Sequence, residues 1–404
     1  MKERTYNKIL LLVCVTVLLA YTVMPAVSLF VPALVRVIFL LLTLLLIIVD
    51  GGGGALMRCL SLLLPVYIVS LLDIIFMAAT NPGQIVGSIY DIGGYMVISC
   101  VAMHFFNDGN YSLAKALLWI VLLFYTITTI STIYGNMLFP EASRMIATGM
   151  SGELTEYNLY RSMNIGGFSF VYEIVFPLAL LPFIFKQKSI PRILTVGFYL
   201  LVLYCVYVTQ FTIALLIVLG YGVFFFLGRL KRSRDFLLYG ILLCVLLTIS
   251  LPWITEYLSV SLDSEILSSR FDEMGNVISG SGASENSDMD ERQSAYMMSI
   301  NAFLSSPVTG TGSHGGGHSF FLDRLAKYGF IGLLVLWIMI SSIFRNYIRP
   351  FKETPFYGYL VLAFGVYLVL IVFNTSPLYM SVTLLLPLIS FVLSKPSFNE
   401  NNNS

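Results

Sequence analysis

FVPALVRVIFLLLTLLLIIV, residues 30–49, is a run of almost entirely apolar side chains in which Arg36 is the only charge. A helix of this length rises about 30 Å, which matches the hydrocarbon thickness of a bilayer. Similar runs recur along the whole chain of 404 residues, of which 57% are hydrophobic and 11% are charged. The mean hydropathy of +0.86 leaves too little polar surface for a water-soluble protein of this size. The sequence therefore predicts an all-α polytopic membrane protein, since a membrane β-barrel would show short alternating strands.

We expect about twelve membrane-spanning helices in a single transmembrane domain that covers residues 1–404. The predicted spans are residues 9–25, 30–49, 60–79, 86–106, 113–139, 168–185, 192–210, 211–228, 236–254, 328–344, 356–374 and 377–394. Only Met24-Pro25 and Pro32 separate the first two spans, which predicts a tight hairpin. The seventh and eighth spans meet near Thr209-Gln210 with almost no loop.

Lys and Arg are distributed unequally between the two ends of these spans. If both termini face the cytoplasm, most of the 23 Lys and Arg residues fall on the cytoplasmic side, including the KRSR run at 231–234, as the positive-inside rule requires. Two outer loops then remain, a smaller one at 140–167 and a large one at 255–327. Within the large loop, residues 291–306 have apolar side chains at helical spacing, which predicts an amphipathic helix that caps the outer face.

Several classes of protein are disfavoured by composition. The net charge of +1 provides no basic field for nucleic acid, so we expect no nucleic-acid partner. The five cysteines lie in or beside apolar segments without zinc-type spacing, and we interpret them as small core residues. The N-terminal MKERTYNK precedes an apolar run but no convincing cleavage site follows, so we expect an uncleaved first helix.

Four charged side chains fall inside predicted spans, each at about the same distance from the outer end of its helix. They are Arg36, Asp73, Asp91 and Glu173. With a rise of about 1.5 Å per residue they lie roughly 8–9 Å below the outer boundary. A charge at mid-bilayer costs at least ~2.5–3.5 kcal/mol unless it is paired or wet. The common depth favours a hydrated cavity that opens outward, where Arg36 and Glu173 would contact substrate; structural ion pairs near the interface are the alternative.

Two of the three histidines lie in a glycine-rich segment, GTGSHGGGHSFFLDRLAKYGFIG at 310–332, directly before an apolar run. A neutral imidazole can accept a proton from a hydroxyl, glycine lets backbone amides approach an anion, and arginine binds phosphate oxygens as a fork. The large loop offers His314, His318, Gly310, Gly312, Arg270, Arg292 and Arg324. This set suits a lipid-linked phosphate together with a hydroxyl acceptor.

Two other interpretations of the histidines stay open at this point. His-x3-His matches metal-ligand spacing on a helix, but the three glycines between His314 and His318 oppose a helix and no cysteine is near. We therefore expect no metal. A glycine-rich hinge with incidental histidines is the other interpretation.

The run from Arg292 to Gly332 resembles the signature of the O-antigen polymerase and ligase superfamily, the Wzy and WaaL types. In that family an arginine precedes a helix, and Ser/Asn-Pro, Gly-x-Gly, His-Asn/Ser, a leucine and an acidic-x-Gly-hydrophobic-Gly entry into the next span follow. The matching residues here are Arg292, Ser306-Pro307, Gly310-Thr311-Gly312, His318-Ser319, Leu322 and Tyr328-Gly329-Phe330-Ile331-Gly332. Lys327 replaces the usual acidic residue near that entry. VTQFT at 208–212 lacks the arginine that the family often carries between two middle spans, a role that Arg161 or Arg270 would then take.

The resemblance implies a GT-C-like glycosyltransferase bundle in the bacterial cytoplasmic (inner) membrane, with no obligatory cofactor. Its substrates would be undecaprenyl-pyrophosphate-linked oligosaccharides, and it would transfer a growing O-antigen, capsule or exopolysaccharide chain onto the next lipid-linked repeat unit at the outer face. His318 would orient or deprotonate the acceptor hydroxyl, while Arg292 and Arg270 would hold the pyrophosphate as it leaves. Membrane lipid, a chain-length regulator and a flippase are the other partners that the resemblance suggests.

Two alternative functions are weighed against polymerisation. An O-antigen ligase shares the fold and the outer-loop histidine but passes the glycan to lipid A-core. A flippase or transporter would place its charges near mid-membrane and show repeat symmetry between its halves. The single dominant outer loop and the charges near one face favour an enzyme.

Overall fold

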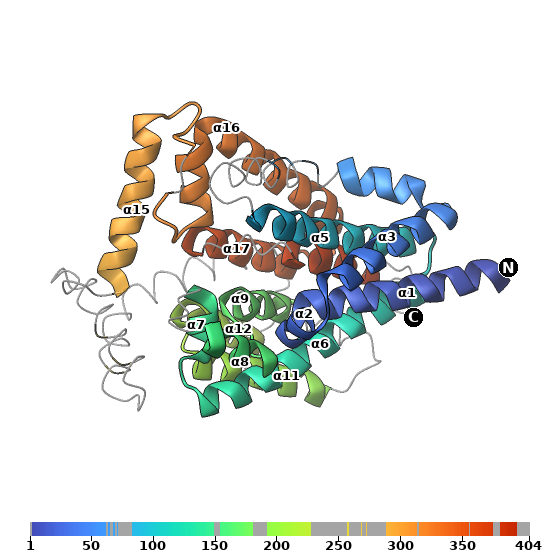
Figure 1. Cartoon of the computed structure of the whole chain (residues 1–404), viewed down its shortest axis with the longest axis horizontal. Helices are drawn as coiled ribbons and strands as arrows, with labels where there is room; N and C mark the ends of the chain where they lie inside the picture. Colours follow the sequence, from blue (N-terminus) through green and yellow to red (C-terminus); the bar gives the residue numbers. More distant parts are fainter. Residues whose placement is uncertain are drawn as a thin grey trace. The chain divides into compact units, whose positions relative to one another are not determined.

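The computed structural model consists of helices throughout the residues that it describes (Figure 1). These residues are 2–61, 83–148, 154–180, 192–227, 288–312, 315–354, 356–374 and 380–393, with single positions at 64, 68, 71, 257, 268 and 272. The chain divides into two compact units, one formed by residues 1–209, 335–350 and 378–404, and the other by residues 210–334 and 351–377. The all-helical prediction is confirmed for the described residues.

The first unit is built on the helices α1 (Lys2–Val23), α3 (Ala33–Val49), α5 (Gly83–Asn107), α6 (Tyr111–Leu138) and α11 (Arg192–Thr209). Helix α1 packs against α3, α5 and α6, and α6 packs against α11. The predicted hairpin between the first two spans is present, with the short helix α2 (Pro25–Phe30) at its turn. Proline suits both breaks, because it fits the first turn of α2 and supplies the N-cap of α3 at Pro32. The unit also contains η2 (Phe344–Ile348), η3 (from Arg349), η4 (Ser381–Leu385) and α18 (Leu386–Leu393).

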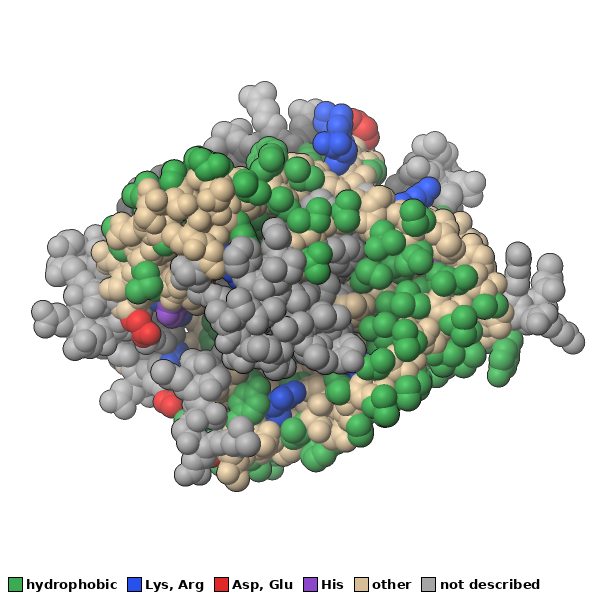
Figure 2. Space-filling model, turned by 45° about the horizontal axis from the view of Figure 1, so that its top comes forward, with side chains coloured by type: hydrophobic (Ala, Val, Ile, Leu, Met, Phe, Trp, Pro, Cys, Tyr) green, Lys and Arg blue, Asp and Glu red, His purple; other side chains and the backbone are tan. Residues whose placement is uncertain are grey.

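Long apolar side chains stand exposed in stripes along several helices. The stripes are Leu34, Ile38, Leu41, Leu45 and Ile48 on α3; Leu123, Ile127, Ile130, Tyr134 and Met137 on α6; and Ile193, Val196, Leu200, Tyr204 and Tyr207 on α11. Spacings of three and four residues put each stripe on one helix face. Hydrophobic side chains accordingly gather in a broad patch in Figure 2. Water-soluble monomers rarely expose so much contiguous apolar surface, so these faces contact lipid and the chain is a multi-pass membrane protein.

Within the described residues, three helices are long and apolar enough to cross a membrane: Tyr6–Val23, Tyr111–Leu138 and Phe320–Phe351. Ala33–Val49 and Gly53–Ser61 make a fourth if they are counted together, although they are bent by 117° at their junction. Shorter apolar helices are Phe168–Ala179, Ile193–Thr209, Thr212–Gly222 and Tyr357–Phe373. The expected spans at 60–79 and 236–254 lie almost wholly outside the described residues, so the count of twelve stays a prediction.

The segment 140–167, which we predicted to be the smaller outer loop, is folded rather than extended in its described residues. It contains α7 (Ala142–Thr148) and α8 (Leu154–Ser162), and leads into α9 (Phe168–Val175) and η1 (Phe176–Ala179). Asn164 donates from its side-chain amide to the hydroxyls of Thr128 and Ser131 on α6, at 3.2 and 3.0 Å. Asn136 of α6 donates to the hydroxyl of Ser143 at 2.7 Å. A buried polar network therefore holds this loop on the end of α6.

The second unit contains α12 (Thr212–Leu227), α15 (Asp288–Ser305), the first part of α16 (Phe320–Ile343) and α17 (Tyr357–Phe373). Helix α11 ends at Thr209 and α12 begins at Thr212, as predicted, with Gln210 at φ 59° between them. The expected helix at 291–306 is confirmed as α15, but its buried residues are Ala295 and Ser299, while Met297, Met298 and Leu304 are at least half exposed. The packed face of α15 is thus made by small residues rather than by the large apolar ones.

Candidate functional site

Helix α16 is broken at Gly329, where the backbone adopts φ 59° and ψ −149°. Only glycine takes this conformation without strain, and a Cβ here would also approach the Pro307 carbonyl oxygen to 2.5 Å. The break therefore needs both a glycine and a neighbouring loop that fits closely against it. That loop, residues 306–312, follows α15 directly.

The loop replaces the hydrogen bonds that the break removes. The amides of Phe330 and Ile331 donate to the carbonyls of Pro307 and Val308, at 2.8 and 3.4 Å. In an unbroken helix they would bond to the carbonyls four residues earlier, at 326 and 327. Those two carbonyls accept instead from the amides of Thr311 and Gly312, at 2.9 and 3.1 Å. This exchange satisfies the backbone internally, as a membrane protein requires near the lipid.

Gly310 and Gly312 have a structural part in this exchange. Both lie at positive φ, 73° and 70°, and a Cβ on Gly310 would overlap the Lys327 carbonyl. The amide of Gly310 donates to the Ser306 carbonyl at 2.9 Å, and that of Gly312 is used as described above. Both amides that we considered for binding an anion are therefore engaged within the protein.

Lys327, the departure from the resembled motif, lies beside the break. Its side chain is buried and its Nζ lies 5.3 Å from the centre of the Tyr328 ring. Arg324, one turn earlier, stacks its guanidinium over Phe320 at 4.7 Å. Both cations at the start of α16 therefore make cation–π contacts with an aromatic ring.

His318 lies next to the beginning of α15. Its Nε2 is 3.9 Å from Oε1 of Glu291, and the side chains are 34% and 73% exposed. Arg292 follows Glu291 on the same helix and is partly exposed. The fold therefore brings a solvent-accessible imidazole to the end of α15 that carries Arg292. Glu291 was not among the predicted site residues, because the histidine beside it lies 27 positions further along the chain.

The candidates in the first unit have protein partners of their own. Arg36 is buried, with its guanidinium 5.0 Å from the Tyr21 ring centre and against Gly94. Arg161 donates to the Ser28 hydroxyl at 2.5 Å, which ties α8 to α2. Glu173 accepts from the Tyr125 hydroxyl at 3.4 Å.

Some of the predicted site residues and intramembrane charges lie outside the part of the chain that the structure describes. Arg270, His314 and Asp73 lie outside the described residues, as does the side chain of Asp91. The expected common cavity of the four intramembrane charges therefore stays a prediction.

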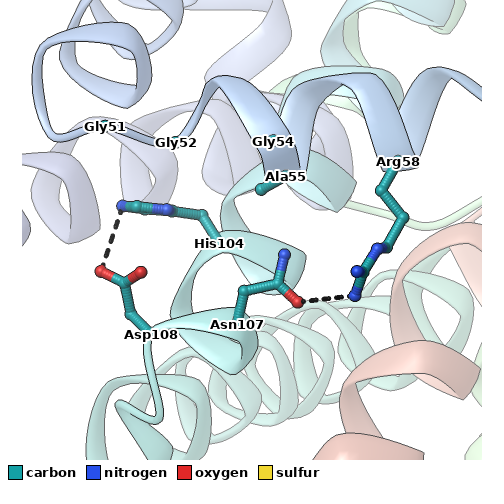
Figure 3. A pocket seen from close by; sticks show the side chains of 8 residues that line it. All are labelled: Gly51, Gly52, Gly54, Ala55, Arg58, His104, Asn107 and Asp108. Atoms are coloured by element: carbon teal, nitrogen blue, oxygen red, sulfur yellow. Dashed lines mark hydrogen bonds and ion pairs between the residues drawn. The ribbon is translucent and has the colours of Figure 1, made fainter.

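A second histidine cluster, which sequence analysis missed, lies in the first unit. His104 Nε2 is 2.9 Å from Asp50 Oδ2 and 3.9 Å from Asp108 Oδ2. An adjoining pocket of about 380 Å³ is shown in Figure 3, and its lining residues are Gly51, Gly52, Gly54, Ala55, Arg58, His104, Asn107 and Asp108. Arg58 donates to Asn107 at 3.2 Å. Gly51 in this turn has φ 81°, and nothing local in the sequence links Asp50 to His104.

This cluster contains three groups that could hold a metal, since ligand atoms of Asp50, His104 and Asp108 lie within 4.8 Å of one another. However, Lys8 Nζ is 2.8 Å from Asp108 Oδ2 and 4.0 Å from Asp50 Oδ2. An ammonium group therefore already compensates the two carboxylates. We interpret the cluster as a charge network that joins α1, the end of α3 and the end of α5.

Residues 197–337 match the Wzy_C family, which is described as O-antigen ligase. The matched stretch includes α15, the glycine loop, His318 and the break in α16. This stretch is similar to a Wzy_C domain. This domain is shared by Wzy polymerases and WaaL ligases, which transfer glycans from undecaprenyl carriers. A comparison with curated proteins found no match.

Proposed function

We propose that this Wzy_C protein is a polymerase of lipid-linked polysaccharide repeat units that acts at the outer face of the cytoplasmic membrane. The observation that carries the proposal is the placement of His318, partly exposed, at the end of α15 that bears Arg292. A hydroxyl acceptor needs a proton acceptor, and a pyrophosphate leaving group needs a cation. The Wzy_C domain supplies both in one folded segment.

The reaction requires one bond to form and one to break. The acceptor hydroxyl oxygen attacks the anomeric carbon of the donor glycan, and the bond from that carbon to the undecaprenyl pyrophosphate breaks. The hydroxyl proton passes to Nε2 of His318, and the electron pair leaves with the pyrophosphate. Arg292, together with Arg270, stabilises the negative charge on the departing oxygens, and Arg324 is a third cation of the same segment.

Glu291 has a supporting role in this scheme. Its carboxylate lies 3.9 Å from the imidazole nitrogen, so it favours the imidazolium that forms when the proton is taken. Because the carboxylate is 73% exposed, water screens this interaction and its contribution is small. Gly310 and Gly312 contribute by folding the loop.

Surface glycan on a gel tests the proposal. The strains compared lack this gene, or carry it as wild type or as His318→Ala. For a polymerase, the deletion reduces the ladder to a single attached repeat unit, and His318→Ala fails to restore it although the protein is inserted in the membrane. A general base contributes about 10²–10⁴-fold to rate, so residual polymer should be scarce.

A ligase is the second candidate, because the matched family is described by that activity. In that case the deletion removes all attached glycan, and polymer accumulates on its lipid carrier. A normal ladder in the His318→Ala strain would contradict the role of His318 in either reaction.

A further inference from the structure

Ser299 and Asp323 form a polar contact between α15 and α16 that neither the domain match nor the proposed chemistry explains. The hydroxyl of Ser299 donates to Asp323 Oδ1 at 2.8 Å, and Ser299 is 2% exposed. In Figure 1, α15 lies beside the first part of α16. A hydrogen bond to a carboxylate is among the stronger kinds in proteins.

The same two side chains also hold the backbone of the glycine loop. The amide of Gly316 donates to Ser299 Oγ at 2.8 Å, and the amide of Gly317 donates to Asp323 Oδ1 at 3.2 Å. A Cβ on Gly316 would overlap the Ala295 backbone, and one on Gly315 would lie 2.6 Å from Asp323 Oδ1. The triple glycine is therefore pressed against α15 at the level of Ser299.

The chain is equally well held directly after His318. Ser319 caps α16, since its hydroxyl accepts from the amide of Leu322 at 3.1 Å. The amide of Phe320, the residue after Ser319, donates to the Asn374 carbonyl at 2.7 Å. His318 is thus fixed from both sides, by the clamp of Ser299 and Asp323 before it and by the helix cap after it, while its ring remains accessible.

We propose that Ser299 and Asp323 are positioning residues that hold His318 at the distance from Arg292 that glycan transfer needs. This inference rests on the proposed function, because it assigns the clamp a purpose only if His318 acts on substrate. Displacing a reacting group by about 1 Å can cost about 10²-fold in rate. Releasing the clamp should therefore lower turnover without weakening the binding of either lipid-linked substrate.

The first measurement is amide hydrogen exchange on the purified full-length protein in detergent. Ser299→Ala should raise hydrogen exchange of the Gly316 amide, and Asp323→Ala that of the Gly317 amide, at least tenfold, since each variant removes the acceptor of that amide. Ser305→Ala is the matched control, because Ser305 lies on the same helix, is exposed, and bonds only to the Ala302 carbonyl. Unchanged exchange in both clamp variants overturns the inference, whatever the enzyme does.

The second measurement is turnover in vesicles with undecaprenyl-pyrophosphate-linked repeat units. The clamp variants should lose about 10–100-fold in kcat with KM within twofold of wild type, in line with a misplaced group. Asp323→Asn keeps an oxygen acceptor and should recover most of the activity that Asp323→Ala loses. This Asn/Ala pair carries the test if Ser299→Ala does not fold.

The two failures are distinguishable. Faster exchange with unchanged turnover would refute the positioning role and leave the proposed function standing, whereas a wild-type protein that adds no repeat unit in the vesicles would refute the proposed function. A loss in Asp323→Asn as large as in Asp323→Ala would point to the negative charge itself and would refute a positioning role.

Discussion

The protein contains two histidine–carboxylate pairs that differ in almost every physical respect. His104 and Asp50 are each 1% exposed and lie 2.9 Å apart, whereas His318 and Glu291 are 34% and 73% exposed and lie 3.9 Å apart. The buried pair is tight, has Lys8 beside it and has no room for a substrate hydroxyl between its partners. The exposed pair is loose and open to solvent. Burial suits the first imidazole to holding helices together, and exposure is what the proposed proton transfer needs from the second.

Replacing each histidine by alanine should separate the two roles most strongly. His318→Ala should lower transfer by about 10²–10⁴-fold, because a general base is lost, while the unfolding temperature in detergent stays that of wild type. His104→Ala should remove the 2.9 Å contact to the buried Asp50 Oδ2, leaving the Lys8 ammonium at 4.0 Å, and should destabilise the fold by about 1–3 kcal/mol. Activity per folded molecule should be kept in His104→Ala.

The distinction between the two histidines would be wrong if His318→Ala and His104→Ala had the same effects on stability and on glycan transfer. Thermal unfolding and product formation are measured on the same preparations. A stable but inactive His104→Ala protein would show that the buried cluster takes part in catalysis.

The next largest effect is expected at the break in α16. Gly329→Ala places a Cβ at φ 59° and within 2.5 Å of the Pro307 carbonyl oxygen. The left-handed conformation alone costs about 1–2 kcal/mol for a residue with a Cβ, and the overlap forces the loop away. Loss of the backbone hydrogen bonds between this loop and α16 should lower thermal stability. It should also slow glycan transfer, because the displaced loop leads to His318.

Gly365→Ala is the matched control for this variant, since a Cβ at that position meets nothing within 4 Å. Helix formation should even improve slightly there, as alanine has the higher propensity. Equal stability and activity of the two variants would rule out a structural need for Gly329.

The smallest effect should come from Glu291→Gln. An exposed ion pair contributes about 0–1 kcal/mol, so turnover should fall no more than about fivefold. The effect should shrink as salt is raised, because the screening length is about 10 Å at 0.1 M salt. Turnover measured at low and high salt checks this, and a hundredfold loss would show that Glu291 acts directly on substrate.

Much of the helical framework could be predicted because it depends on local composition. The run at 30–49 contains α3, and the predicted span at 113–139 nearly coincides with α6, Tyr111–Leu138. In both, a continuous apolar run leaves the backbone no other way to satisfy its hydrogen bonds in lipid. The position of α15 also followed from local spacing. Its packed face did not, because a glycine loop distant in sequence covers Ala295 and Ser299.

The candidate site shows the same division. His318 and Arg292 were found from residue types and from a motif that resembles the Wzy_C domain. Gly310 and Gly312 were expected to approach an anion, but the amides of both donate within the loop that joins the broken helix. No local pattern predicts that geometry. Glu291, Ser299 and Asp323 were passed over because a charged or hydroxyl side chain in a polar loop normally faces solvent.

By itself, the sequence determined that this is a helical membrane protein with a segment similar to the Wzy_C domain, because hydrophobicity, charge and motif order are properties of the chain alone. Tertiary structure decided which histidine is buried with Asp50 and Lys8, which one is left open beside Glu291, and how residues 307–312 repair the break at Gly329. Each of these contacts joins residues that are distant along the chain. Their free energy depends on the distance between them and on their exclusion from water, and only the folded chain sets both.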